Sequence, residues 1–436
     1  MPLQAPGSLA GLVSLFAGCF TRPTFRTFRA LVIGFIAAVG EHTVTGCLVA
    51  SGMAGRWHHS RAHRFFARAR WSPDRLGLVL LDCVLERLVP DGAPLLIAID
   101  DTLLKRSGRR VWGTAWHHDG AGHSPWRWLA WGNCWVVAAV VISLPFLNRP
   151  VALPVLCRLW TKREQTKCQL AAELVALITT RYPQREVQIV GDGHFASLAL
   201  LCPTDVTLTA RLRADAALHE LAPPRTGQRG RPRLRGARLP SLTQIATHPD
   251  TIWETTQARR YGQSATVRIH RLTCLWYRAY RDRPLRVLLI SDPASREPFD
   301  LALVSTDLHA PSFELVERFA RRWSIEVAFE DAKQLIGVGD ARNRTEQAVK
   351  RTAPFGLLCM SLTIVWYALY GHSPADVANH RARAPWYRTK TTPSTADMLA
   401  KLRRSIIAAQ YSPPPLSDHN RQKINAIQQA WAAALP

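Results

Sequence analysis

The sequence predicts a mixed α/β fold, because two apolar runs that end in aspartate are separated by long helical patterns. The two runs, residues 94–102 and 186–193, are typical of strands buried on both faces of a sheet. A separate β-rich stretch lies between residues 251 and 306. At 436 residues the chain can hold two or three structural units. We therefore expect a mixed sheet, a β-rich insertion and helical segments at both ends of the chain.

The first ninety residues are predicted to be helical. Residues 24–39 carry apolar side chains at helical spacing, and a shorter helix over residues 43–50 follows a break at Gly40. Two short helices joined by a tight turn are compatible with a helix-turn-helix DNA-binding unit, although the pattern alone is weak.

Residues 56–71 interleave basic and aromatic side chains, among them Arg64 and Arg68. One interpretation is a surface that neutralises phosphates and stacks on sugars or bases. The other is a helix that buries Phe65, Phe66 and Trp71 while its arginines are merely solvated. The sequence leaves both open.

Residues 91–222 alternate strands and helices. After the first apolar run we expect β-rich sequence over residues 126–142, a long helix over 163–182 and the second apolar run. A helix over 195–201 and a strand over 205–212 complete this part.

Residues 223–306 begin with a basic loop and continue as short strands. The loop, residues 223–240, contains no acidic residue and no periodicity. Its Arg229-Gly-Arg-Pro232 segment matches the core of a minor-groove AT-hook, and generic phosphate contact is the alternative. The candidate DNA contacts here are Arg229, Arg231 and Arg233. Residues 265–272, 285–291 and 301–305 are the expected strands.

A long helical pattern lies between Pro311 and Gly337. Steps of three, four and seven residues place Phe319, Arg322, Glu326 and Lys333 on one stripe of this helix. An ordinary solvated pair between Arg322 and Glu326 would produce the same spacing. Residues 345–371 and 395–409 are also predicted to be helical. The apolar run at 353–371 is interrupted by Pro354 and polar residues, which favours a buried helix over a membrane span.

The charge balance points to a polyanionic partner. The chain has 56 Lys and Arg against 32 Asp and Glu, a net charge of +24. Dense positive charge binds phosphates and releases their counterions, so nucleic acid is the first choice and an anionic membrane the second. The nine cysteines form no Cys-x2-Cys pair, and the N-terminus lacks the pattern of a secretory signal. Both observations favour a reducing, cytoplasmic setting.

Three carboxylates are placed where chemistry could use them. Asp100 and Asp192 end the two apolar strands, and Glu326 lies between two cations on its helix. Each aspartate alone could be a turn or capping residue. Together the three offer the oxygen ligands that hard divalent ions prefer, and two Mg²⁺ ions can drive an in-line displacement at phosphorus.

The motifs Asp100-Asp-Thr, Gly191-Asp-Gly and Phe319-x2-Arg-x3-Glu-x6-Lys resemble those of cut-and-paste DDE transposases of bacterial insertion sequences. Those relatives carry tyrosine where this chain has Phe319, so a phosphate contact of that hydroxyl should be missing. The resemblance implies a ribonuclease H-like catalytic core formed by residues 91–222 and 307–372. It also implies an insertion over 223–306, an N-terminal DNA-binding region over 1–90 and a helical tail over 373–436.

The resemblance further implies the activity and its partners. Asp100, Asp192 and Glu326 would bind two Mg²⁺ ions, with Mn²⁺ as a substitute, and Arg322 and Lys333 would contact phosphates. The substrates would be terminal inverted repeats and target DNA, with a homodimer in the synaptic complex and no membrane. A cytoplasmic, nucleoid-associated location follows.

Several alternatives stay open within this resemblance. Asp101 could replace Asp100 as first ligand, and Glu330 lies one turn beyond Glu326. Trp253 or Trp276 could stack on a flipped base or could simply fill the core of the insertion. The whole chain could also be a catalytically inactive, transposase-derived DNA-binding protein.

Overall fold

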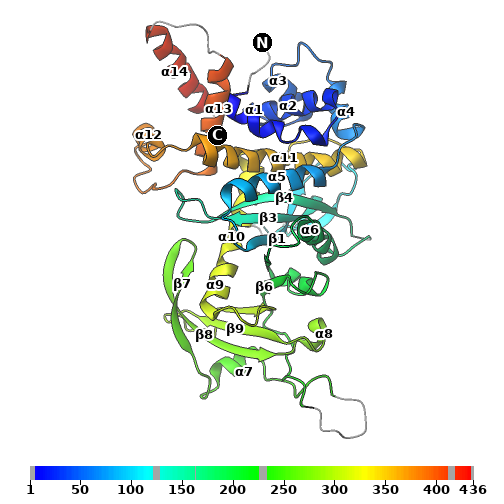
Figure 1. Ribbon diagram of the computed structural model, residues 1–436, viewed down its shortest axis with the longest axis vertical. Coiled ribbons are helices and arrows are strands. Elements are labelled where there is room, and N and C mark those ends of the chain that lie inside the picture. Colours follow the sequence, from blue (N-terminus) through cyan, green and yellow to red (C-terminus); the bar gives the residue numbers. More distant parts are fainter. Residues whose placement is uncertain (1–4, 121–127, 163, 225–232, 411–417, 434–436) are drawn as a thin grey trace.

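The computed structural model describes residues 5–120, 128–162, 164–224, 233–410 and 418–433. A central sheet lies between a helical region at one end of the molecule and a β-rich region at the other (Figure 1). The longer helices are α1 Gly7–Ser14, α2 Arg22–Ala37, α3 Val44–Ala50, α4 Ser60–Ala67, α5 Pro73–Leu88, α6 Lys167–Arg181, α9 Ser312–Arg321, α10 Trp323–Gln334, α11 Glu346–Trp366, α12 Asp376–Arg383, α13 Thr395–Gln410 and α14 Asp418–Ala433. The shorter α7 and α8 span Leu242–Thr247 and Tyr277–Tyr280.

The strands of the described chain form one ten-stranded sheet in the order β2-β3-β1-β5-β6-β10-β9-β8-β7, and β4 also pairs with β3. Their bounds are β1 Leu95–Lys105, β2 Ala115–His118, β3 Leu129–Ile142, β4 Val151–Trp160, β5 Val187–Gly191, β6 Thr207–Arg211, β7 Glu254–Arg260, β8 Gln263–Cys274, β9 Leu285–Ser291 and β10 Leu301–Ser305. β3 runs antiparallel to β1 and β4, whereas β5 is parallel to both β1 and β6. The predicted mixed α/β fold is therefore confirmed.

Strand β1 lies inside the sheet between β3 and β5, and its first half is apolar on both faces. Leu95 to Ile99 are buried, and each pairs with a residue of β5. The β1–β5 ladder ends at Ile99, whereas the β1–β3 ladder continues to Lys105. The edge of β1 beyond Asp100 is consequently not covered by β5. Other groups can therefore approach the polar side chains in this part of β1.

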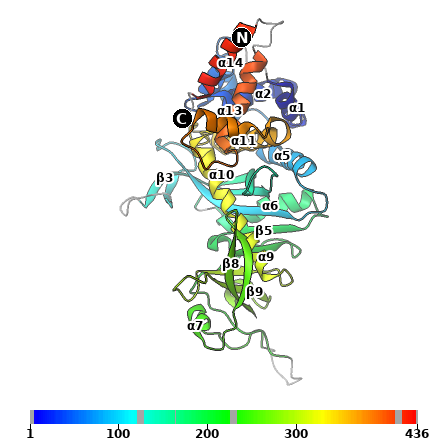
Figure 2. The ribbon, with the colours of Figure 1, turned by 90° about the vertical axis from the view of Figure 1, so that its left-hand side faces the viewer.

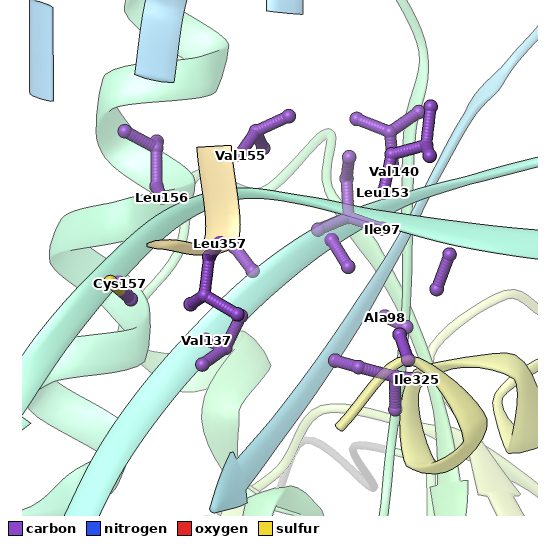
Figure 3. Packing of buried hydrophobic residues seen from close by; sticks show 14 of the residues in the cluster. Ile97, Ala98, Val137, Val140, Leu153, Val155, Leu156, Cys157, Ile325 and Leu357 are labelled. Atoms are coloured by element: carbon purple, nitrogen blue, oxygen red, sulfur yellow. The ribbon is translucent and has the colours of Figure 1, made fainter. Parts of the chain in front are cut away.

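Helices cover the two faces of the sheet. α6 contacts β3 and β4 on one face, and α5, α10 and α11 contact β1 or β4 on the other. Figure 3 shows Ile325 of α10 directed toward Ala98 of β1. Both residues are fully buried. This contact fixes the position of α10 two residues before Asp100 on the strand.

The N-terminal helices pack around α11. Phe355 of α11 makes edge-to-face contacts with Phe28, Phe65 and Phe66. The buried Arg351 guanidinium donates hydrogen bonds to the carbonyls of Phe66, Ala69 and Trp71. The aromatic residues of the 56–71 segment are thus core residues. Stacking of Phe65, Phe66 or Trp71 on nucleic acid is excluded.

The β-rich segment continues the central sheet. β10 pairs with β6 on one side and with β9 on the other, so the ladder passes without a break from β1 to β7. A second apolar cluster lies between this part of the sheet and α9, with Val267, Ile290 and Phe319 among its members.

Several local expectations differ from the structure. The helix expected over residues 195–201 is two short 3₁₀ turns, Gly193–Phe195 and Leu198–Leu200. Strands β2 and β4 were not expected. The single helix expected between Pro311 and Gly337 is interrupted at Arg322, where the backbone N–H groups of Arg322 and Ile325 bond three residues back instead of four.

Helix α11 is long and apolar enough to cross a membrane by length and composition, together with the turn that follows it to Gly371. However, 83% of its most apolar window is buried inside the protein. The structure therefore places it as the central core helix, as the sequence predicts.

Candidate active site

Asp100 lies where β1 leaves the cover of β5. Side chains alternate along a strand, so Asp100 shares the α10 face with Ala98, whereas Asp101 lies on the α6 face. The contacts agree with this alternation: Asp100 pairs with Arg322 and Asp101 with Lys167. The two aspartates therefore belong to different surroundings, although they are adjacent in sequence.

The joint between α9 and α10 positions Arg322. One guanidinium nitrogen lies 2.8 Å from Asp100 Oδ2, and the other lies 2.5 Å from Glu326 Oε1. Asp100 and Arg322 are 14% and 13% exposed, so this bridge is largely shielded from water. The i, i+4 pair predicted from the sequence is present, and it also extends to Asp100 on the strand. Glu326 and Asp100 are thus brought together by a shared cation.

Asp192 follows β5 and caps the short turn after it. Its Oδ1 accepts hydrogen bonds from the backbone N–H groups of His194 and Phe195. Burial raises the pKa of Asp100 to about 7. The positive charge of Arg322 opposes this rise, and the negative charge of Asp192 adds to it. Gly191 pairs with Ile99, so Asp192 follows β5 beside Asp100.

The opposite face of β1 carries a charged pair that the sequence did not reveal. Lys167, the first residue of α6, lies 2.8 Å from Asp101 Oδ2, and the thiol of Cys134 donates to the same oxygen. Burial alone would lower the pKa of Lys167. Interactions with Cys134, Asp101 and Asp192 outweigh burial and raise it. Only the capping box at Thr166 could be found from sequence, and it shows where the helix starts but not what faces it.

Lys333 and Phe319 lie farther from the carboxylates. The exposed Lys333 makes no hydrogen bond or ion pair with any residue that the structure describes. Its pKa is lowered, chiefly by loss of hydration, with Asp119 and Lys105 among its charged neighbours. Phe319 is 9% exposed, and its ring packs in the second apolar cluster beneath Arg322. The stripe thus combines a core residue, a bridging pair and an unpartnered cation.

Glu330, the alternative to Glu326, is exposed and accepts a hydrogen bond from Gln334. The bridge through Arg322 reaches Glu326. The geometry therefore favours Glu326 as the partner of Asp100.

The other predicted nucleic-acid contacts lie outside the group formed by Asp100, Arg322 and Glu326. Arg64 and Arg68 are exposed on and just after α4, and Arg233 is exposed at the edge of the basic loop. Arg229 and Arg231 lie outside the described residues. Trp253 and Trp276 are half-buried against the main core, and the guanidinium of Arg268 lies over the Trp253 ring.

Asp100, Asp192 and Glu326 offer the carboxylate oxygens that Mg²⁺ or Mn²⁺ would require. In the described part of the chain, no three such side chains are close enough together to hold an ion as they stand. Instead, Arg322 supplies a positive charge between two of them. The carboxylate oxygens are thus of the type that binds a divalent ion. For an ion to bind between them, Arg322 would have to move from the bridge toward another anion.

A family model described as DDE superfamily endonuclease matches residues 15–283, which is more than half of the chain. The matched segment contains Asp100 and Asp192, and Glu326 lies beyond it. No curated protein matches the chain significantly.

Proposed function

Since the chain belongs to the DDE superfamily endonucleases, we propose that it is the transposase of a bacterial insertion sequence. In this proposal it binds terminal inverted repeats, cleaves the DNA strand at each end and joins the 3′ ends to target DNA. The observation that carries the proposal is the meeting of Asp100, Arg322 and Glu326, with Asp192 beside them, in a protein of this family.

The strand order supports a ribonuclease H-like core. Three antiparallel strands (β1, β3 and β4) are followed by β5 and β6, which run parallel to β1 in the order β4-β3-β1-β5-β6. Asp192 follows the end of β5, and Asp100 lies in the middle of β1. Both would face α10, the helix that carries Glu326. The proposed N-terminal DNA-binding region over 1–90, the insertion over 223–306 and the tail over 373–436 complete the assignment.

Asp100, Asp192 and Glu326 would hold the metal ions, which activate a hydroxyl nucleophile and stabilise the leaving oxygen when bound. Arg322 would exchange its carboxylate partners for a DNA phosphate, because a bidentate guanidinium suits either anion. Lys333, which has no described ion-pair partner, would bind a neighbouring phosphate. Homodimerisation on paired DNA ends, a cytoplasmic location and the absence of a membrane partner are parts of the same proposal.

The test is cleavage of a labelled DNA fragment that carries the flanks of the element, with and without Mg²⁺ or Mn²⁺. We expect metal-dependent cleavage by the wild type and at least a hundredfold loss in Asp192→Asn and Glu326→Gln, because each substitution removes a ligand oxygen charge. Glu330→Gln is the matched control, one helical turn away, and should cleave normally.

Wild-type rates in Asp192→Asn or Glu326→Gln would contradict the proposal. Tight binding of the flanks without nicking by the wild type, in either metal, would instead support the catalytically inactive DNA-binding alternative. The closed bridge of Arg322 over Asp100 and Glu326 is the observation that keeps that alternative open.

A further inference from the structure

The strands β2 and β3 form a ribbon that extends away from the body of the protein (Figure 2). Within it, Trp116 of β2 lies directly opposite Trp131 of β3. Their ring centroids are 5.7 Å apart, in an edge-to-face arrangement. The β3 segment that carries Trp131 is the same strand whose other half is buried in the core.

Two tryptophans on or beside this ribbon are exposed, whereas Trp131 is half-buried and donates its indole N–H to the carbonyl of Gly108. Trp116 is 56% exposed, and Trp128, the residue before β3, is 58% exposed. Exposure of an apolar indole ring to water is unfavourable, and clustered exposed aromatic side chains usually mark a binding surface. Neither Trp116 nor Trp131 belongs to the main apolar cluster of the described residues, whereas Trp135 on the same strand is buried in it.

Basic side chains lie on and beside the ribbon. The ammonium of Lys162 lies 2.5 Å from the carbonyl of Trp116. His118 is exposed on the ribbon, and Arg109 and Arg110 are exposed in the segment that leads into it. The acidic Asp119 is buried and paired with Lys105. The ribbon therefore presents aromatic rings and positive charge together, which is the combination that binds unpaired nucleotides.

The ribbon lies within reach of the candidate active site. Asp100 pairs with Val137, and the N–H of Arg106 donates to the carbonyl of Trp131, six residues away on the same strand. At about 3.3 Å per residue this separation is roughly 20 Å, or about six nucleotides of a DNA strand. Lys333 lies near the ribbon, since Lys105, which pairs with Gly132 of β3, and Asp119, which directly follows β2, are among its charged neighbours.

We propose that the β2–β3 ribbon binds unpaired DNA bases roughly 20 Å from the cleavage point, by stacking on Trp116 and Trp131 and by phosphate contact with Lys162. The proposal rests on the proposed function only in taking DNA as the substrate. A strand that has been cut or separated from its complement offers bases that no longer stack on the duplex. The ribbon would hold such a strand away from the carboxylates.

The test is binding, measured by fluorescence anisotropy in EDTA so that no cleavage occurs. The probes are a blunt duplex and the same duplex with a single-stranded extension of about ten nucleotides. We expect Trp116→Ala to bind the extended probe about tenfold more weakly, the effect of losing one stacked base, and the blunt duplex within twofold of the wild type. Trp116→Phe, which keeps an aromatic ring, should recover most of the affinity.

Trp386→Ala is the matched control, because Trp386 is even more exposed than Trp116 but lies beyond α12. Equal affinity of Trp116→Ala and wild type for the extended probe would overturn the proposal, as would an equal loss in Trp386→Ala. Circular dichroism melts would check that each variant is folded. Because binding is measured without metal, a failure of this experiment is distinct from a failure of metal-dependent cleavage.

Discussion

At the scale of single residues, the most informative feature is the separation of Asp100 from Asp101. The sequence could not choose between them, because both follow the same apolar run. The strand settles their surroundings: Asp100 shares a cation with Glu326, and Asp101 binds Lys167 on the other face. This distinction depends on which helix covers which face, and local sequence does not contain that information.

The raised pKa of Asp100 leads to a prediction about stability in metal-free buffer. A carboxyl whose pKa rises from 3.8 to about 7 on folding binds its proton more tightly in the folded state. Its contribution to stability is therefore fully present below pH 3.8 and is lost as pH rises through about 7. Asp100→Asn should remove this loss, so the variant should gain stability relative to wild type between pH 4 and pH 8.

Urea unfolding in EDTA at several pH values measures this difference. Mg²⁺ added at pH 8 should stabilise the wild type more than Asp100→Asn, because ion binding to the folded state offsets the electrostatic cost. A constant difference between the two proteins across the pH range would refute the assignment.

At the scale of elements, close packing between α5 and β4 constrains the sequence at Gly77. A Cβ atom at Gly77 would lie 2.0 Å from the carbonyl oxygen of Val155. The helix can lie against the strand at this distance only because the side chain is absent. Glycine therefore stays in the helix despite its low helix propensity.

Gly77→Ala should destabilise the protein by about 1–3 kcal/mol, because overpacking outweighs the gain in helix propensity. Gly11→Ala in α1 is the matched control, since nothing lies within 4 Å of the added Cβ. That change should stabilise the protein by roughly 0.5–1 kcal/mol. Thermal melts of both variants check the pair, and a stable Gly77→Ala protein would show that α5 can move away from β4.

Elements with strong local patterns were predictable and the others were not. The apolar runs of β1 and β5, and the capped helix α6, were found because their patterns are long. β4 was missed because Pro154 and the turn residues before it obscure its apolar run. The interruption at Arg322 was missed because one residue of different backbone hydrogen bonding leaves no mark on the helical periodicity. The resemblance led to the three candidate carboxylates, whereas Lys167 and the exposed Trp116 of the ribbon could be found only from the fold.

At the scale of the whole molecule, the net charge of +24 is spread over both ends of the protein. Arg64 and Arg68 lie in the N-terminal helical region, and the exposed Arg238 pairs with His219 in the β-rich region at the opposite end (Figure 1). DNA bound to both regions would pass the candidate active site between them. Such a path favours a long duplex over a short one.

Double substitution of Arg64 and Arg68 by glutamine should weaken binding of the element's flanks and reduce the salt dependence. If both arginines contact phosphates, the slope of log K against log salt should fall by about 2. Arg381→Gln with Arg388→Gln, two exposed arginines near α12, is the control for loss of charge alone. Anisotropy titrations between about 50 and 200 mM salt measure both slopes, and identical slopes in the two double variants would exclude a specific role for α4.

The packing of the N-terminal helices around α11 has a consequence for synthesis of the protein. A ribosome releases the first ninety residues long before it makes Arg351 and Phe355. Phe355 completes the aromatic core of these N-terminal helices, and Arg351 donates hydrogen bonds to three of their backbone carbonyls. The emerging chain must therefore wait, with apolar helices unprotected, until most of its length has been translated. Nascent chains of this protein should accordingly depend on chaperones, and they should acquire protease resistance only after residue 366 has left the exit tunnel.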